Sequence, residues 1–184
     1  RPCGPGSRTA ELADNGLPGQ APFTRGAAAS RELEGWDIRA WFADPDVERT
    51  AKDVVTDLEN GVNSLWLSVG TGGIPIDALA KILEPVFIDL AAVVLDAPFE
   101  PLDAAKVLAA LIADKGVTAA PGTSFSVDPL CAPFGGRGLV DLDAAVEVAR
   151  LTAPVGVRAF KADPTAVQQA AAPPAPQSSY RLPH

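Results

Sequence analysis

Short apolar runs alternate with amphipathic helical patterns along this chain, and the alternation limits its possible folds more than any other feature. Five runs rich in β-branched or aromatic residues predict strands at residues 35–42, 63–70, 90–97, 123–128 and 156–163. The patterns between them predict helices at residues 46–60, 76–84, 101–115 and 140–152. A strand about every 30 residues, with helix in between, predicts βαβ units and therefore an α/β fold with a parallel sheet.

Two α/β architectures fit these units, and the residues alone leave both open. A flavodoxin-like sheet is complete with five strands in about this length, and its strand order reverses at one point. A (β/α)8 barrel keeps its strands in sequential order and needs eight units and about 250 residues. On that fold the chain would be an incomplete parallel barrel, with about five of the eight βα units.

Composition divides the chain into three parts around this pattern. Residues 1–34 mix glycine, proline and alanine with scattered charges, which predicts an irregular N-terminal arm. Residues 35–163 hold the strand and helix patterns and form the predicted folded domain. In residues 164–184 proline, alanine and glutamine replace the apolar period, which predicts a disordered tail.

The first predicted helix carries signals at both ends. Asp44 is expected to be its N-cap, with Pro45 in the first helical position, and Gly61 is expected at its C-terminal end. On its exposed side Glu48 and Lys52 stand four residues apart, a spacing that predicts an ion pair.

Composition also bounds the class of protein. A net charge of −8 argues against a nucleic-acid surface, and no apolar run is long enough to cross a membrane. Cys3 and Cys131 are far apart, which favours a reducing, cytoplasmic setting, while a disulfide between them stays open. The sequence has no methionine, so we expect a processed chain or a piece of a longer one.

Side chains for catalysis are scarce. The single histidine, His184, is the last residue, which excludes Ser-His-Asp and Cys-His catalysis and any histidine-containing metal site. Asp44, Asp96, Asp128 and Asp163 each follow a predicted strand, so a barrel could gather them into a carboxylate cluster. The prolines that follow three of them favour a simpler interpretation, in which these acids cap turns or helices.

Two glycine-rich loops allow anion binding but do not require it. The first, VGTGGIP at residues 69–75, lacks the third glycine of a dinucleotide loop and the lysine of a P-loop, so a tight turn is the simpler interpretation. The second, CAPFGGRG at residues 131–138, holds Arg137 and is typical of a surface loop. From the residues alone, the prediction is an α/β domain without a catalytic set.

Several segments resemble a known family: PGQAPFTRG (18–26), GWDIRAW (35–41), DLENGVNSLWLSVG (57–70) and LAAVVLDA (90–97). They are similar to the coenzyme A mutases that use adenosylcobalamin, and most of all to the small, non-catalytic methylmalonyl-CoA mutase chains. The resemblance covers about residues 17–167 and implies a (β/α)8 barrel, of which this chain carries about five strands. It also implies a heterodimer whose large subunit interconverts succinyl-CoA and (R)-methylmalonyl-CoA.

The departures from catalytic members of that family imply that this chain is inactive. The tyrosine that works at the radical site of catalytic chains is replaced by Trp41, whose indole has a donor and no acceptor. Glu34 and Asp37 stand where catalytic chains carry arginine and threonine near an anionic thioester. The cobalamin loop is absent, so adenosylcobalamin and the coenzyme A thioester are expected on the partner chain.

Some family positions are kept, and each implies a role. Arg39 is retained and is the candidate for vestigial substrate binding. Phe23, Arg25 and Trp36 are expected to hold the N-terminal arm against the barrel. No catalytic residue and no metal ligand is expected in this chain.

Overall fold

Five short parallel strands form one sheet in the computed structural model, which describes residues 17, 19–21, 36–131, 141–163 and 165. The chain divides into two units, residues 1–37 and residues 38–184, and the second holds the sheet. In the first unit, the amide of Gln20 donates to the carbonyl oxygen of Leu17 across 3.1 Å. Gly19 has a φ of 79° in this turn, a conformation that glycine adopts without strain.

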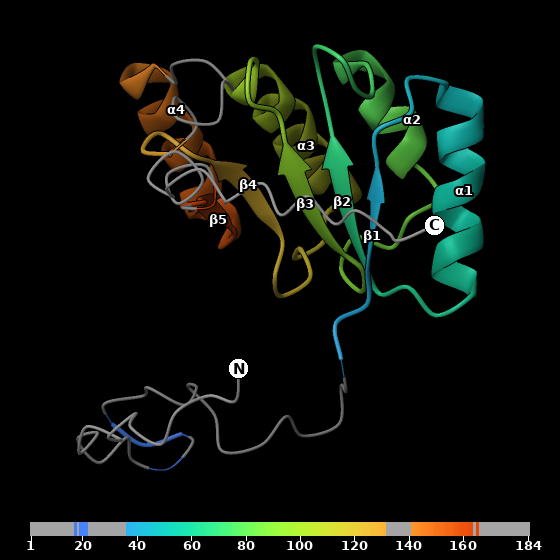
Figure 1. Ribbon diagram of the computed structural model, residues 1–184, viewed down its shortest axis with the longest axis horizontal. Helices are drawn as coiled ribbons and strands as arrows, with labels where there is room; N and C mark the ends of the chain where they lie inside the picture. Colours follow the sequence, from blue (N-terminus) through green and yellow to red (C-terminus); the bar gives the residue numbers. More distant parts are fainter. Residues whose placement is uncertain (1–16, 18, 22–35, 132–140, 164, 166–184) are drawn as a thin grey trace, which may run out of the picture. The chain divides into compact units, whose positions relative to one another are not determined.

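The strands follow one another across the sheet in the order of the sequence (Figure 1). They are β1 (Arg39–Phe42), β2 (Ser64–Ser68), β3 (Ala92–Asp96), β4 (Ser124–Val127) and β5 (Arg158–Phe160). Every neighbouring pair is parallel. The predicted α/β class and parallel sheet are confirmed, and each strand is shorter than the apolar run that predicted it.

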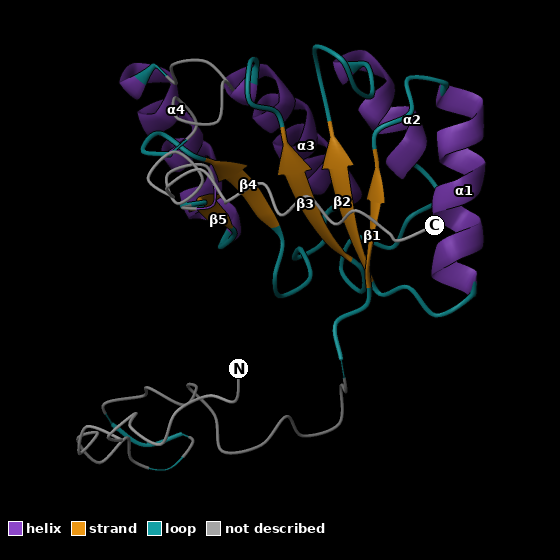
Figure 2. Ribbon diagram, viewed as in Figure 1, coloured by secondary structure: helices purple, strands orange, loops and turns teal. Residues whose placement is uncertain are grey.

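Helices connect the strands, as the patterns predicted (Figure 2). They are α1 (Val47–Glu59), α2 (Leu79–Leu83), α3 (Pro101–Lys115) and α4 (Leu142–Thr152). Two short 3-10 turns accompany them: η1 (Ile76–Ala78) runs into α2, and η3 (Ala153–Val155) follows α4. In α3 the proline stands in the first position and Gly116, with a φ of 62°, ends the helix, which are the usual places of these residues at helix ends.

One face of the sheet packs against the helices. Leu65, Leu67, Val93 and Leu95 alternate along β2 and β3 and join a single core with side chains of all four helices. Each helix packs against the next one along the chain. The residues between these core positions, such as Val94, lie on the other face because side chains alternate along a strand.

The sequential order makes the flavodoxin-like alternative wrong. A flavodoxin-like sheet places its first strand between later ones, with helices on both faces. Here β1 lies at one edge, β5 lies at the other, and the four helices share one core. Consecutive right-handed βαβ units without a reversal give this arrangement.

The start of α1 differs from the prediction. Asp46, not Asp44, is the N-cap, and its carboxylate accepts from the amide of Arg49 across 3.0 Å. Asp44 lies outside the helix and accepts from the amide of Asp46 (2.9 Å) and the guanidinium of Arg49 (3.0 Å). The hydrogen bond from the Asp46 amide, and then Arg49, lower the pKa of the Asp44 carboxyl. Pro45 therefore precedes the helix, and Val47 takes the first helical position that was predicted for the proline. The sequence did not decide the cap, because both aspartates have a side chain that can serve as one.

The end of α1 is nearer to expectation. Asn60 is the C-cap, and Gly61 follows with a φ of 105°, a left-handed conformation that favours glycine. The predicted pair of Glu48 with Lys52 is not the one that the structure shows. Glu48 pairs with Lys81 of α2 instead, which joins two neighbouring helices.

Candidate functional site

The candidate site is the face of the sheet opposite the helices, which we call the second face. It carries tryptophans from β1 and β2 and polar or charged side chains from all five strands. Its residues alternate with the core positions of β1 to β5: Arg39, Trp41, Ser64, Trp66, Ser68, Ala92, Val94, Asp96, Ser124, Ser126, Arg158 and Phe160. In enzymes built on parallel barrels, chemistry takes place at the carboxyl ends of the strands, so a site would lie where Ser68 and Asp96 end β2 and β3.

Two side chains of the edge strand β1 lie across the neighbouring strand. The Arg39 Nε donates to Ser64 Oγ across 3.0 Å, and the Trp41 Nε1 donates to Ser68 Oγ across 2.8 Å. Trp41 is 65% exposed, so its ring covers β2 without being buried. The one donor of the indole is therefore committed to a serine, and the ring offers no acceptor in its place.

A largely buried ion pair lies at the carboxyl end of β3, the middle strand of the sheet. The Lys161 ammonium is 3.0 Å from a carboxylate oxygen of Asp96, and their side chains are 25% and 12% exposed. The same ammonium is 5.7 Å from the centroid of the Trp66 ring, within the range of a cation–π contact. Burial of a charge requires such partners, because an unpaired ion loses its hydration without compensation.

Asp128 ties together the loops that follow β4 and β5. One of its carboxylate oxygens accepts from the amides of Leu130 (3.2 Å) and Cys131 (2.8 Å), and the other accepts from the amide of Asp163 (2.9 Å). Asp163 in turn accepts from the amide of Thr165 across 3.1 Å. The predicted capping role is thus confirmed for Asp128 and Asp163.

The four strand-end aspartates do not form a catalytic carboxylate pair. Asp44 serves the start of α1, Asp128 and Asp163 serve turns, and Asp96 pairs with a lysine. Among the residues that the structure describes, no group of three or more His, Cys, Asp or Glu side chains could hold a metal ion. An enzyme built on these aspartates therefore has no support in the described geometry.

The glycine loop after β2 is a tight turn. The amides of Gly70, Gly73 and Ile74 donate to carbonyl oxygens of the loop itself or of the preceding strand end, at 2.8–2.9 Å. The amide and hydroxyl of Thr71 donate to the Glu100 carboxylate at 3.2 and 2.6 Å. A phosphate would need these amides and would meet a carboxylate, so the turn interpretation is confirmed.

A bulge in β4 was not predicted from the sequence. The register shifts between Ser124 and Val127, and Ser126 has a φ of 47°, which is uncommon for a residue with a side chain. The amide and hydroxyl of Ser126 both donate to the Ser124 hydroxyl, at 3.1 and 3.0 Å. These local bonds compensate for part of the backbone strain.

Sequence reasoning also missed Lys161 and Trp66. Period-two alternation in residues 63–70 placed Trp66 opposite the core leucines, and this signal could have assigned it to the second face. Lys161 follows β5, and the partner of its ammonium is 65 residues away in sequence. No local pattern predicts such a contact.

Other predicted residues fall outside the described part of the chain. Phe23, Arg25 and Arg137 are among them, as is Cys3. Trp36 is described and is 83% exposed, and Cys131 is a free thiol. The predicted role of the arm residues stays a prediction. Of the helices that the structure describes, none has the length and apolarity to cross a membrane.

Comparison with known proteins gives the family. The chain matches no family model. It is 40% identical over 165 residues to the methylmalonyl-CoA mutase small subunit of Streptomyces virginiae, covering 86% of this chain and 27% of the relative. It is 34% identical over 158 residues to a probable methylmalonyl-CoA mutase small subunit of Mycobacterium bovis, covering 83% of this chain and 26% of that relative.

A shorter match supports the same assignment. The small subunit of methylmalonyl-CoA mutase from Propionibacterium freudenreichii is 40% identical over 76 residues, which is 41% of this chain and 12% of the relative. The chain spans about a quarter of the length of the first two relatives. By sequence, therefore, the chain is a homologue of the methylmalonyl-CoA mutase small subunits over the region that it shares with them.

Proposed function

We propose that this chain is part of a non-catalytic mutase small subunit that supports a large catalytic subunit in a heterodimer. The large subunit would interconvert succinyl-CoA and (R)-methylmalonyl-CoA and would hold both adenosylcobalamin and the coenzyme A thioester. The observation that carries the proposal is the match to small subunits at 40% identity over 86% of the chain. The reducing setting favoured by the cysteines and the coenzyme A chemistry suit the cytoplasm.

We propose that residues 35–163 are five consecutive units of a (β/α)8 barrel. The sequential parallel order of β1 to β5 and the single helix-covered face support this, since a barrel keeps its helices outside. The polar second face would then line the interior. The open edges of β1 and β5 are where further strands would pair.

Two hydrogen bonds on the second face support the proposal that this chain is not catalytic. Trp41 stands at the position of the family's tyrosine, and its indole N–H is committed to Ser68. Arg39, the retained family arginine, donates to Ser64. We propose that Arg39 has kept its place in the strand as a vestige of substrate binding and now holds β1 to β2.

The described residues do not fit adenosylcobalamin. They include no imidazole to ligate cobalt, since the single histidine of the chain is residue 184. Asp44, Asp96, Asp128 and Asp163 already accept hydrogen bonds or pair with a lysine. The chain is therefore assigned a supporting role and no step that uses the cofactor.

Association with a large mutase subunit tests the proposal. The two chains are co-expressed, and the mixture is separated by size at physiological salt. We expect one complex with a single copy of each chain, and no mutase turnover by the small chain alone. Separate elution of the two chains at that salt concentration refutes the supporting role.

A further inference from the structure

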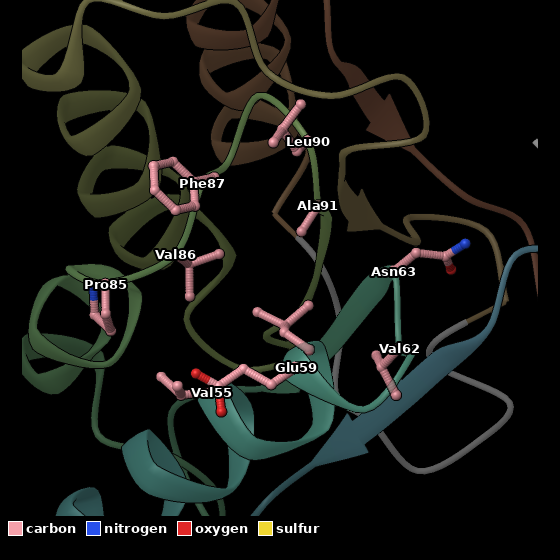
Figure 3. Close-up of a pocket in the computed structure, with 10 residues that line it drawn as sticks. Val55, Glu59, Val62, Asn63, Pro85, Val86, Phe87, Leu90 and Ala91 are labelled. Atoms are coloured by element: carbon pink, nitrogen blue, oxygen red, sulfur yellow. The ribbon is translucent and has the colours of Figure 1, made fainter.

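An apolar groove lies at the amino-terminal ends of β2 and β3, away from the carboxyl ends of the strands. Figure 3 shows its lining, which comes from the last turns of α1, the turn before β2 and the loop between α2 and β3. Its apolar lining includes Val55 and Leu58 of α1, Val62, and Phe87 and Leu90 of the loop. The hollow holds about 360 Å³, which is the size of a few side chains.

The two outermost side chains of the groove are large, apolar and exposed. Phe87 is 72% exposed and Leu90 is 76% exposed. They stand three residues apart in one loop, so they form one apolar patch. Exposed aromatic and aliphatic side chains that cluster beside a hollow are a feature of protein-binding surfaces, whereas single apolar side chains scattered over a surface are ordinary.

The loop that presents these side chains is fixed in place. Val86 and Ile88 are each 2% exposed and bury the alternate positions of the loop in the core. The Lys115 ammonium donates to the carbonyl oxygens of Glu84 (2.8 Å) and Val86 (3.1 Å). The amide of Leu90 donates to the carbonyl oxygen of Phe87 across 3.0 Å. A partner would therefore meet a surface that needs little ordering, which favours binding.

The charges around the groove select the chemistry of its occupant. Glu59 is the charged residue of the lining, and the exposed residues Glu84 and Asp89 belong to the loop. Lys115 is a nearby cation, and its ammonium donates to two backbone carbonyls. An apolar floor with a negative rim complements apolar side chains flanked by positive charge.

We propose that this groove docks a segment of a partner protein in which bulky apolar side chains are flanked by Lys or Arg. Its apolar side chains fill the hollow between α1 and the Phe87–Leu90 turn, and its cations lie against Glu59 and Asp89. An anionic ligand or a nucleic acid would meet the negative rim instead. This inference goes beyond the proposed function and does not depend on it, since none of the residues that line the groove belongs to the second face.

Peptide binding by the full chain tests the proposal. The probes are two fluorescein-labelled amphipathic peptides with the same leucines, one with lysine and one with glutamate at the polar positions. Fluorescence anisotropy is expected to show saturable binding of the lysine peptide. The glutamate peptide is expected to bind at least about tenfold more weakly.

Two variants place the binding in the groove. Leu90→Asp is expected to weaken the lysine peptide by at least about tenfold, and Glu59→Lys is expected to weaken it and to strengthen the glutamate peptide. Leu142→Asp is the matched control, because Leu142 is 68% exposed on α4 and is outside the groove. It makes the same chemical change and should leave binding unaltered, and circular dichroism confirms that each variant folds.

Three outcomes overturn the proposal. Equal binding of both peptides would show that charge does not select the occupant. Equal losses of peptide affinity in Leu90→Asp and Leu142→Asp would show that the peptide does not bind in the groove. Sedimentation of the chain alone provides the third measurement. Self-association that Leu90→Asp abolishes would make a second copy of this chain the occupant, and the proposed partner would be wrong. None of these outcomes bears on the association with a mutase large subunit.

Discussion

Replacing Lys161 with methionine should destabilise the fold through Asp96. Methionine keeps an apolar stem beside Trp66 and removes the ammonium that lies 3.0 Å from the Asp96 carboxylate. At this separation, an effective dielectric constant of about 20 gives an attraction of about 5–6 kcal/mol. Desolvation of the two groups offsets part of it, and a quarter of the Lys161 side chain remains exposed.

We therefore expect Lys161→Met to lower the free energy of unfolding by about 3 kcal/mol, because it leaves a buried carboxylate without its cation. For a chain of this size the melting temperature should fall by about 6–12 °C. Urea denaturation followed by circular dichroism measures the change. Lys106→Met is the matched control, since the Lys106–Asp103 pair is 58% and 67% exposed and its loss should cost less than about 0.5 kcal/mol.

A double-mutant cycle separates the pair from its surroundings. Asp96→Asn in the Lys161→Met background should recover part of the loss, giving a coupling of about 1–3 kcal/mol between the two sites. If the two changes add without coupling, or if Lys161→Met costs no more than Lys106→Met, the ion pair does not stabilise the second face.

Three further predictions follow from other contacts. Asp128→Ala should cost about 2–3 kcal/mol, because three amides lose their acceptor, whereas Asp141→Ala at the N-cap of α4 should cost about 1 kcal/mol; urea denaturation compares them. Because the pKa of Asp44 is lowered in the fold, its stabilisation is present above the ordinary carboxyl pKa and is lost as pH falls through the lowered value. Asp44→Asn should thus be destabilising at neutral pH and neutral in strong acid, and an equal effect at both pH values would contradict this. Trp41→Phe should loosen β1 by less than about 1 kcal/mol, since one exposed hydrogen bond to Ser68 is lost; hydrogen exchange at β1 measures it, with Trp66→Phe as comparison.

Local patterns were enough to predict the elements of this fold. The strand and helix periods depend on residues close together in sequence, so all five strands and four helices were found within a few residues of their observed bounds. The choice of cap at α1 could not be made in this way. Asp44 and Asp46 flank the same proline, and both have the side chain that a cap needs.

Contacts between distant segments could not be predicted from the sequence. Glu48 has a cation four residues away in Lys52, yet it pairs with Lys81, which is 33 residues away. Glu100 closes the glycine loop from 29 residues away, and Lys161 reaches Asp96 across the sheet. Such pairs depend on strand order and helix packing, which the local period does not specify. The family resemblance supplied that order, and the sheet agrees with it.

The sequential order of the sheet also bears on how the chain can fold during synthesis. Each strand pairs with the strand made just before it, through a crossover that contains one of the four helices, so no pairing has to wait for a later strand. A flavodoxin-like order would require a later strand to pass beside an earlier one before the core could form. This order allows each new strand to add at the exposed edge of the existing sheet as the chain leaves the ribosome. The sheet can therefore lengthen one unit at a time, and no strand has to be inserted between two that are already paired.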